Sequence, residues 1–168
     1  MRFSAPFFIF PAALVLAFAG CTPKAAAPQE ATPVAAPQPA VAGPRVIDLI
    51  PTGDQIKFTT KLIEAKPNEE LKIVLKNSGT NGAMVHNFIL LDPETDIESF
   101  AQAAAAAKAT DYFPPDYADG AIVHSKTVGP GQTVELVFKA PATPGKYEYL
   151  CSYPGHYLIG MRGVLEVK

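Results

Sequence analysis

Short apolar segments separated by turn residues make up most of the chain after residue 45. Several of them alternate hydrophobic and polar residues with the period of two that is typical of half-buried strands. Glycine- and proline-rich breakers at 129–131 and 141–145 divide them. This pattern predicts an all-β domain built as a sandwich or barrel. The expected strands are residues 55–59, 71–76, 86–91, 122–128, 133–139, 146–151 and 164–168.

One stretch has a helical pattern instead. Thr95-Asp-Ile-Glu98 has the spacing of a capping box and precedes an alanine-rich run at 100–109. Because alanine has the highest helix propensity, we expect a helix over residues 96–108. It must end before the prolines of 112–115. We expect this helix to be a lid at one end of the strands, in which Tyr112, Tyr117 and the turn at Pro114-Pro115 pack rather than line a substrate pocket.

The first twenty residues have the pattern of a secretory signal peptide. Arg2 supplies a positive start, Phe7 to Ala19 is apolar, and small residues precede the expected cleavage before Cys21. The segment Phe18-Ala-Gly-Cys21 resembles a bacterial lipoprotein box, although Phe18 departs from the usual leucine. The resemblance implies a diacylglyceryl thioether on Cys21 and a chain anchored to a membrane without crossing it. The alternative is ordinary cleavage that leaves Cys21 unmodified.

Composition divides the remainder into a tether and one domain. Residues 22–44 hold eight alanines and six prolines, so the stretch from the lipidated Cys21 to Pro44 is expected to be a semi-extended tether. Residues 45–168 have the size of a single domain and a net charge of −3, with 12 basic and 15 acidic residues. No basic patch suggests nucleic-acid binding. Because Cys21 and Cys151 are the only cysteines, lipid on the first leaves the second without a disulfide partner.

The chemistry-bearing residues gather near the C-terminus, in Cys151-Ser-Tyr-Pro-Gly-His156-Tyr-Leu-Ile-Gly-Met161. A thiol, an imidazole and a thioether follow one another at five-residue intervals on one loop after an apolar strand. Upstream, His86 begins another apolar run. Two imidazoles, a thiolate and a weak axial methionine make a blue-copper site, which holds one copper ion and passes single electrons. The sequence therefore predicts copper ligands at His86, Cys151, His156 and Met161.

Each of these residues alone has an ordinary explanation as part of a packed core. Their spacing favours a metal site, because Pro154 and Gly155 turn the chain so that Cys151 and His156 face one point.

The same segments resemble the cupredoxin family, in particular auracyanins and azurins. The resemblance covers residues 72–168 and includes 84–87, 121–126 and 161–167, and the four residues between His156 and Met161 match auracyanin. It implies an eight-stranded Greek-key β-sandwich with copper near one end, with His86, Cys151 and His156 as equatorial ligands and Met161 as the axial one. The resemblance also implies that His124, in a strand next to Ser125 and Lys126, is exposed and not a ligand. Azurins have a glycine before the upstream histidine, whose carbonyl is a distant fifth contact; here that residue is Val85.

The surroundings of the ligands can also be predicted. A metal-bound imidazole normally donates its other N–H to a fixed acceptor, so we expect His86 to find one inside the protein and His156 to turn its free edge to solvent. By resemblance, Asn87 ties the His86 strand to the ligand loop through Ser152 or the Cys151 backbone. Backbone N–H groups directed at the sulfur would tune the potential. A docking patch for redox partners is expected around His156: Met84, Tyr153, Pro154, Leu158 and Ile159.

These features predict a monomeric, lipid-anchored protein of the periplasm or cell surface that carries single electrons between transient partners and is not an enzyme. Two other classes remain open. A copper reservoir or delivery protein would favour more methionines than Met84 and Met161, and a thiol enzyme would need an orienting residue and an open cleft beside Cys151 and His156. A multicopper oxidase or nitrite reductase needs more ligands than three histidines supply.

Overall fold

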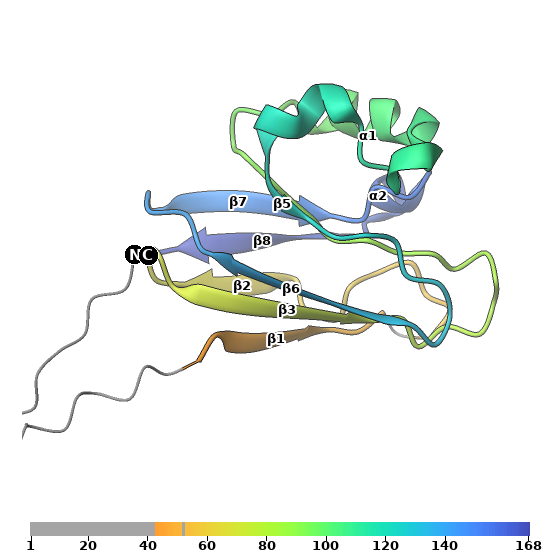
Figure 1. The fold of residues 1–168 in the computed structure, drawn as a ribbon, viewed down its shortest axis with the longest axis horizontal. Helices are drawn as coiled ribbons and strands as arrows, with labels where there is room; N and C mark the ends of the chain where they lie inside the picture. Colours follow the sequence, from red (N-terminus) through yellow and green to blue (C-terminus); the bar gives the residue numbers. More distant parts are fainter. Residues whose placement is uncertain (1–42, 52) are drawn as a thin grey trace, which may run out of the picture. The chain divides into compact units, whose positions relative to one another are not determined.

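Eight strands form two mixed sheets within residues 43–51 and 53–168, which are the residues that this computed structural model describes (Figure 1). The three-stranded sheet has the order β1-β3-β6 and the five-stranded sheet the order β2-β8-β7-β4-β5. The predicted all-β sandwich with one inserted helix is confirmed. The strands are β1 (Arg45–Leu49), β2 (Leu62–Ala65), β3 (Glu70–Lys76), β4 (Ile89–Leu91), β5 (Ala121–His124), β6 (Thr133–Lys139), β7 (Gly145–Leu150) and β8 (Arg162–Val167).

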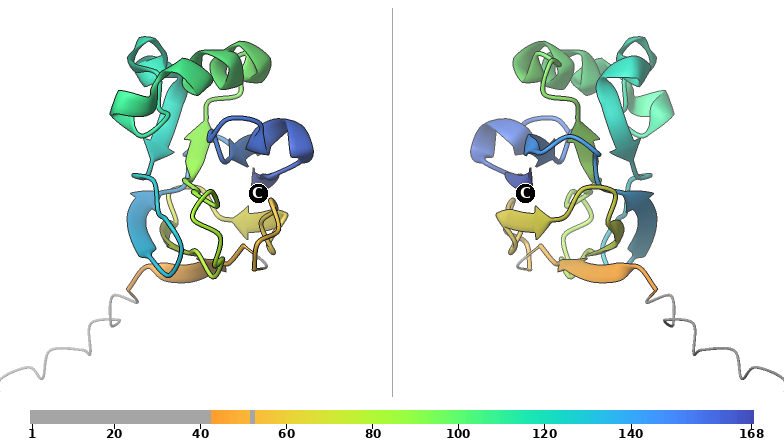
Figure 2. Two further views of the ribbon diagram at one scale, coloured as in Figure 1. Left: turned by 90° about the vertical axis from the view of Figure 1, so that its right-hand side faces the viewer. Right: turned by 90° about the vertical axis from the view of Figure 1, so that its left-hand side faces the viewer.

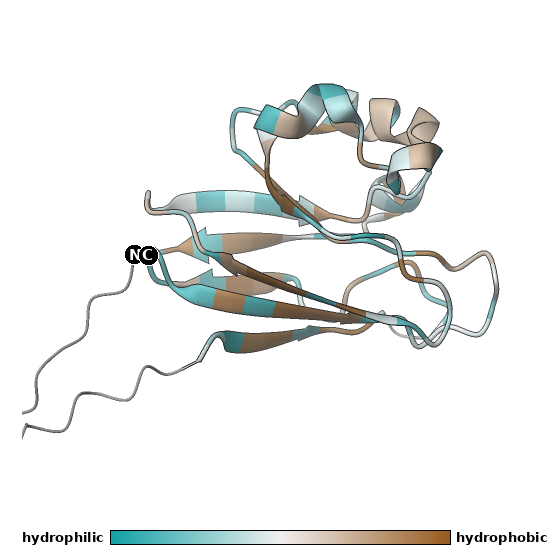
Figure 3. Cartoon of the chain, viewed as in Figure 1, coloured by the Kyte–Doolittle hydropathy of each residue, from teal (hydrophilic) through white to brown (hydrophobic). Residues whose placement is uncertain are grey.

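The main core contains residues from both sheets. Strand β3 alternates buried and partly exposed residues, and its buried members Leu71, Ile73 and Leu75 belong to the same cluster as Tyr147 and Tyr149 of β7. Figure 3 shows hydrophobic residues concentrated along the strands. Strands β1 and β3 run parallel, as do β2 and β8, and the other neighbours are antiparallel.

Strand β4 is buried on both faces, which explains why its sequence is a continuous apolar run. Leu90 belongs to the main core, while Ile89 and Leu91 pack in a second cluster with Phe100 and Ala104 of the helix. Helix α1 (Ile97–Ala106) and the short turns η1 (Lys108–Thr110) and η2 (Pro115–Gly120) lie together on this side of the strands (Figure 2). The predicted lid is therefore a covering layer over β4 rather than a separate domain.

The helix boundaries differ from those predicted. Asp96, not Thr95, is the N-cap, and its carboxylate accepts a hydrogen bond from the Ser99 N–H at 2.7 Å. The Thr95 hydroxyl instead donates to the carbonyl of Gly120, because this threonine joins the helix to the start of β5. The helix ends at Ala106 and not at Lys108, after which the chain tightens into η1.

The predicted strand at 55–59 is wrong. In that stretch only Phe58 makes a bridge, to Pro51, and its ring is buried in the core, which explains the apolar pattern without a strand. Strands β1 and β2 were not predicted, since both are short and carry exposed residues such as Val46 and Leu62. The predicted strands at 86–91 and 122–128 are each interrupted, with one bridge between His86 and Val128 outside the regular pairing.

The predicted signal peptide at 1–20 and the lipidation site Cys21 lie outside the described residues, as does the tether except for Gly43 and Pro44. Within the described part of the chain, no helix has the length and apolar character needed to cross a membrane.

Candidate metal centre

His86 is held in place by the backbone just before β4. Its N–H donates to the Val128 carbonyl at 3.0 Å, and its carbonyl accepts from the Val128 N–H at 2.7 Å. Asn77, which is fully buried, donates from its side-chain amide to the carbonyls of Met84 and Val128 at 2.6 and 3.0 Å. Asn77 therefore fixes both segments beside His86. The sequence does not reveal this role, because a Lys-Asn-Ser-Gly stretch has the composition of an ordinary turn.

The ligand loop begins where β7 ends and returns into β8. Gly155, with φ of +82°, allows the turn that the sequence predicts, and His156 N–H closes this turn on the Tyr153 carbonyl at 3.0 Å. His156 then starts the single turn α2 (His156–Ile159). Met161 N–H donates to the His156 carbonyl at 2.9 Å, and the Met161 carbonyl accepts from the Cys151 N–H at 3.0 Å. Backbone hydrogen bonds thus join Cys151, His156 and Met161 directly.

Three of the predicted ligands converge on one point. The ligand atoms of His86, Cys151 and His156 all lie within 4.8 Å of one another. The Cys151 sulfur is 3.4 Å from Nδ1 of His156, and the two imidazole centroids are 5.1 Å apart. Cys151 and Met161 have no exposed surface, and His156 has 3%. The site is therefore almost closed to water and contains one thiol and two imidazoles.

Asn87 links the two ligand-bearing segments, as the resemblance implies. Its carbonyl oxygen accepts the Ser152 N–H at 2.8 Å, and its amide donates to the Ser152 hydroxyl at 2.8 Å and to the Asp111 carbonyl at 2.9 Å. Asp111 and Tyr112 both have positive φ, so the chain after α1 turns sharply into this contact. Asn87 and Ser152 therefore connect the metal centre to the lid as well as to each other.

Burial decides which of the three side chains carry a proton when no metal is bound. It raises the pKa of the Cys151 thiol to about 12, and the backbone N–H groups of Asn87 and Tyr153, which point at the sulfur, oppose this rise. Burial lowers the pKa of His86 to about 4, helped by the neighbouring charge of His156, and lowers that of His156 to about 4. At neutral pH the metal-free site thus holds a protonated thiol and two neutral imidazoles.

Copper binding should therefore release one proton per ion at neutral pH. Only Cys151 has to lose a proton there, so the apparent affinity should rise about tenfold per pH unit between roughly pH 5 and 11. Below about pH 4 the imidazoles are also protonated, and the dependence should steepen toward three protons. Titration of the metal-free protein in weak buffer measures this release. Release of two or more protons at pH 7 would contradict the neutral imidazoles.

The surroundings of His86 differ from the prediction. Neither of its ring nitrogens has a hydrogen-bond partner within the described residues, although both are fully buried. The expected internal acceptor is therefore absent among the described residues. Buried polar atoms without partners cost free energy, and a metal ion coordinated by one nitrogen would remove part of that cost. The donor set fits copper, since thiolate and imidazole suit both of its oxidation states.

The remaining predicted residues differ in how far they are exposed. His156 keeps 3% of its surface exposed. His124 is exposed and stacks on Phe113, with centroids 3.9 Å apart, and it is not part of the ligand cluster. In the docking patch, Leu158 and Ile159 are 82% and 66% exposed, the highest values among the large hydrophobic residues described. Pro154 is also exposed, and Met84 and Tyr153 are partly buried.

A β-sandwich whose end carries a buried thiol between two imidazoles defines the class of cupredoxin copper proteins. Residues 47–168 match the family described as copper binding proteins, plastocyanin/azurin family. The chain belongs to this family, and its site holds one copper ion. The predicted resemblance to auracyanins and azurins is confirmed.

Individual relatives agree with this assignment. Auracyanin-B of Chloroflexus aurantiacus is 30% identical over 115 residues, which cover 68% of this chain and 48% of the relative. Outer membrane protein H.8 of Neisseria meningitidis serogroup B is 32% identical over 64% of this chain and 60% of its own length. The chain thus spans about half to three-fifths of these two relatives. The structure of auracyanin A from Chloroflexus aurantiacus, described as a "blue" copper protein, matches with a TM-score of 0.66 and 32% identity over 75% of this chain and 100% of that chain.

Proposed function

We propose that this protein carries single electrons between larger redox partners, with His86, Cys151 and His156 as equatorial ligands and Met161 as the axial one. The observation that carries this proposal is the buried cluster of one thiol and two imidazoles within 4.8 Å. Bound copper supplies the redox chemistry, cycling between Cu(II) and Cu(I).

The protein's contribution is a site that keeps its shape. Backbone hydrogen bonds join Cys151, His156 and Met161, and Asn87 holds the loop against the strand of His86. Such fixed positions leave little to rearrange when the charge of the site changes, which favours fast transfer. The N–H groups of Asn87 and Tyr153 directed at the sulfur would also set the potential.

The exposed side chains beside His156 support transient docking. Leu158 and Ile159 lie on the turn that His156 begins, so a partner that covers them comes close to a ligand. An exposed apolar patch of a few side chains suits a small, short-lived interface. We propose that Met84, Tyr153 and Pro154 complete this docking patch and that the domain itself, residues 45–168, is monomeric.

This function can be tested through electron exchange between copper-loaded molecules. The wild type should show an intense blue or green band and a reversible one-electron wave. Leu158→Asp should slow self-exchange by about tenfold, because two patches would meet with like charges. Val137→Asp is the matched control: this valine is 51% exposed on β6, outside the docking patch, and should have little effect. Equal slowing by both variants would argue against docking through this patch.

The geometry also weighs against a thiol enzyme. Cys151 has no exposed surface, and burial raises its pKa, whereas a nucleophilic cysteine needs access and a lowered pKa. A reservoir that releases copper would need an open, adaptable site. The metal centre of this protein is almost closed to water, and hydrogen bonds hold its segments together. We therefore favour an electron carrier that is not an enzyme.

We further propose that the protein is exported and anchored by lipid on Cys21, with residues 1–20 as signal peptide and 21–44 as tether. The lipobox-like segment supports this, as does the similarity to a protein named for the outer membrane. The periplasm or cell surface would then be its location.

Cys21→Ser should release the protein from membranes. Cys21 carries the acyl groups, and the tail that follows it is polar enough to stay in water. Fractionation of cells that express either form measures this, with Cys151→Ser as a control that should stay in the membrane fraction. A Cys21→Ser protein that still sediments with membranes would contradict lipid anchoring.

A further inference from the structure

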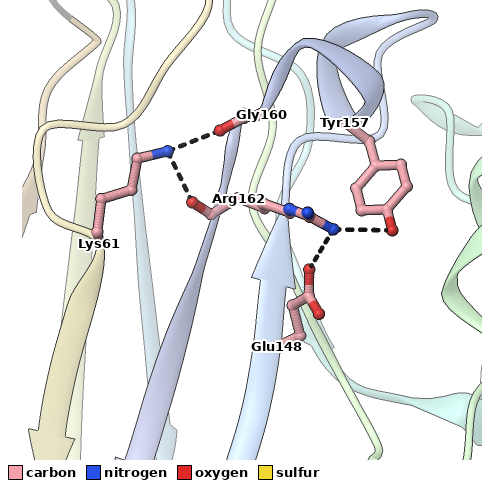
Figure 4. A network of polar contacts seen from close by, with 5 residues as sticks. All are labelled: Lys61, Glu148, Tyr157, Gly160 and Arg162. Carbon is pink, nitrogen blue, oxygen red and sulfur yellow. Dashed lines mark hydrogen bonds and ion pairs between the residues drawn. The ribbon is translucent and has the colours of Figure 1, made fainter.

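Lys61 contacts the ligand loop on both sides of Met161. Its ammonium donates to the carbonyl of Gly160 at 2.6 Å and to the carbonyl of Arg162 at 2.9 Å (Figure 4). Met161 lies between these two residues and has no exposed surface. Lys61 comes from a segment about a hundred residues earlier, just before β2. The contact is therefore a tertiary one that the loop sequence does not reveal.

The base of this lysine is firmly fixed. Its carbonyl accepts the Val164 N–H at 2.9 Å, and the buried Tyr149 donates its hydroxyl to the neighbouring Thr60 carbonyl at 2.6 Å. Gly163 makes this close approach possible, since a Cβ there would lie 2.3 Å from the Tyr149 ring and 2.7 Å from the Lys61 carbonyl. The side chain of Lys61 thus extends from a backbone segment that hydrogen bonds attach to β8 and to the buried Tyr149.

A chain of hydrogen bonds leads from Lys61 to the ligands. The Gly160 carbonyl belongs to the same peptide unit as the Met161 N–H, which donates to the His156 carbonyl at 2.9 Å. A charge on the carbonyl side of a peptide polarises its N–H, so the two bonds strengthen each other. Fixing the Gly160 carbonyl also limits rotation of the peptide on the N-terminal side of Met161, while the Arg162 carbonyl lies in the second peptide after this residue.

A second contact steadies the other end of the turn. Arg162 donates to the Tyr157 hydroxyl at 3.0 Å, lies 5.0 Å from the centroid of its ring, and pairs with Glu148 at 3.4 Å (Figure 4). These groups are partly exposed, so the ion pair adds little stability by itself. Lys61 is the residue whose side chain reaches the backbone carbonyls on either side of Met161.

We propose that Lys61 is a positioning residue for Met161, holding the thioether in place relative to the other three ligands. This inference rests on the axial assignment of Met161 made above. A loosened thioether would change the ligand field of Cu(II) and open a route for the metal to leave. Lys61 thereby stabilises both the spectrum and the retention of copper.

The test compares Lys61→Met with Lys57→Met in the full-length, copper-loaded protein. Lys57 is an exposed lysine, and its charge helps to lower the pKa of Lys61. Among the described residues, its side chain makes no hydrogen bond to the ligand loop. K61M should alter the EPR spectrum of the Cu(II) form, speed copper loss to a chelator roughly tenfold and speed hydrogen exchange at the Met161 amide. K57M should change none of these, and Lys61→Arg, which keeps a charged donor, should restore the wild-type EPR spectrum.

A double variant separates positioning from a general structural effect. In a Met161→Leu background there is no thioether to position, so K61M should no longer alter the EPR spectrum. Unchanged spectra and release rates in K61M would overturn the proposal, as would equal changes in K57M or an EPR effect that persists with leucine. If Met161→Leu by itself changes neither spectrum nor potential, the axial assignment fails instead. Exchange at the residue 161 amide would still report whether Lys61 holds the loop.

Discussion

Replacing Cys151 with serine should abolish the coloured band of the copper protein. The band arises from charge transfer between the thiolate sulfur and copper, and a hydroxyl oxygen cannot supply it. Copper affinity should fall by at least about 100-fold, since loss of outer partners of a metal site alone costs up to that much. The visible spectrum and a competition titration with a chelator measure both effects. Serine is close in size to cysteine, so the buried position should still pack.

His124→Ala is the control for this experiment. His124 is the one histidine of the described chain outside the ligand cluster, and it stacks on Phe113 at the surface. Its loss should leave the spectrum and the copper stoichiometry unchanged. A Cys151→Ser protein that remains intensely blue, or a His124→Ala protein that loses copper, would contradict the ligand assignment.

Exchanges at Met161 should shift the reduction potential in opposite directions. Met161→Leu removes a weak donor and makes the buried site more apolar, and both changes disfavour the more highly charged Cu(II), so the potential should rise. Met161→Gln offers a harder oxygen donor that favours Cu(II), so the potential should fall. A tenfold change in the relative affinity for the two oxidation states corresponds to about 59 mV, and we expect shifts of at least this size. Voltammetry on both variants beside the wild type measures them.

The pair of variants also tests the position of the sulfur. Both should keep copper, because the three other ligands supply the strong bonds. Shifts in the same direction, or loss of copper from either variant, would show that Met161 is not a weak axial ligand. Backbone hydrogen bonds connect Met161 to both Cys151 and His156, which supports the assignment.

The unpartnered His86 ring bears on how the site is stabilised. Its two nitrogens are buried without hydrogen bonds among the described residues, and burial keeps the ring neutral by lowering its pKa to about 4. Such a histidine destabilises the metal-free protein and is ready to bind a metal without losing a proton. Copper should thus add to the stability of the fold through the affinity of this site.

Much of the architecture follows from local patterns that sequence displays directly. The alternation along β3, the double-sided apolar run of β4 and the alanine-rich helix each reflect the period of one element, so they were predictable. The helix begins one residue later than predicted, because threonine and aspartate are both good N-caps and the sequence offers Thr95 and Asp96 side by side. Only the contact of Thr95 with Gly120, across 25 residues, decides between them.

The candidate metal centre also has a part that the sequence predicts and a part that only the tertiary structure reveals. Cys151, His156 and Met161 lie close along one loop with turn residues between them, so the sequence alone predicted these ligands, with His86, and copper as their metal. The partners of that set come from distant segments: Asn77 beside His86, Asp111 behind Asn87, and Lys61 on the carbonyls around Met161. Each acts through a hydrogen bond to backbone, which any suitable side chain can make and which leaves no motif. Only the packing of the two sheets and the lid brings these groups to the metal centre, and that packing decides how firmly the ligands are held.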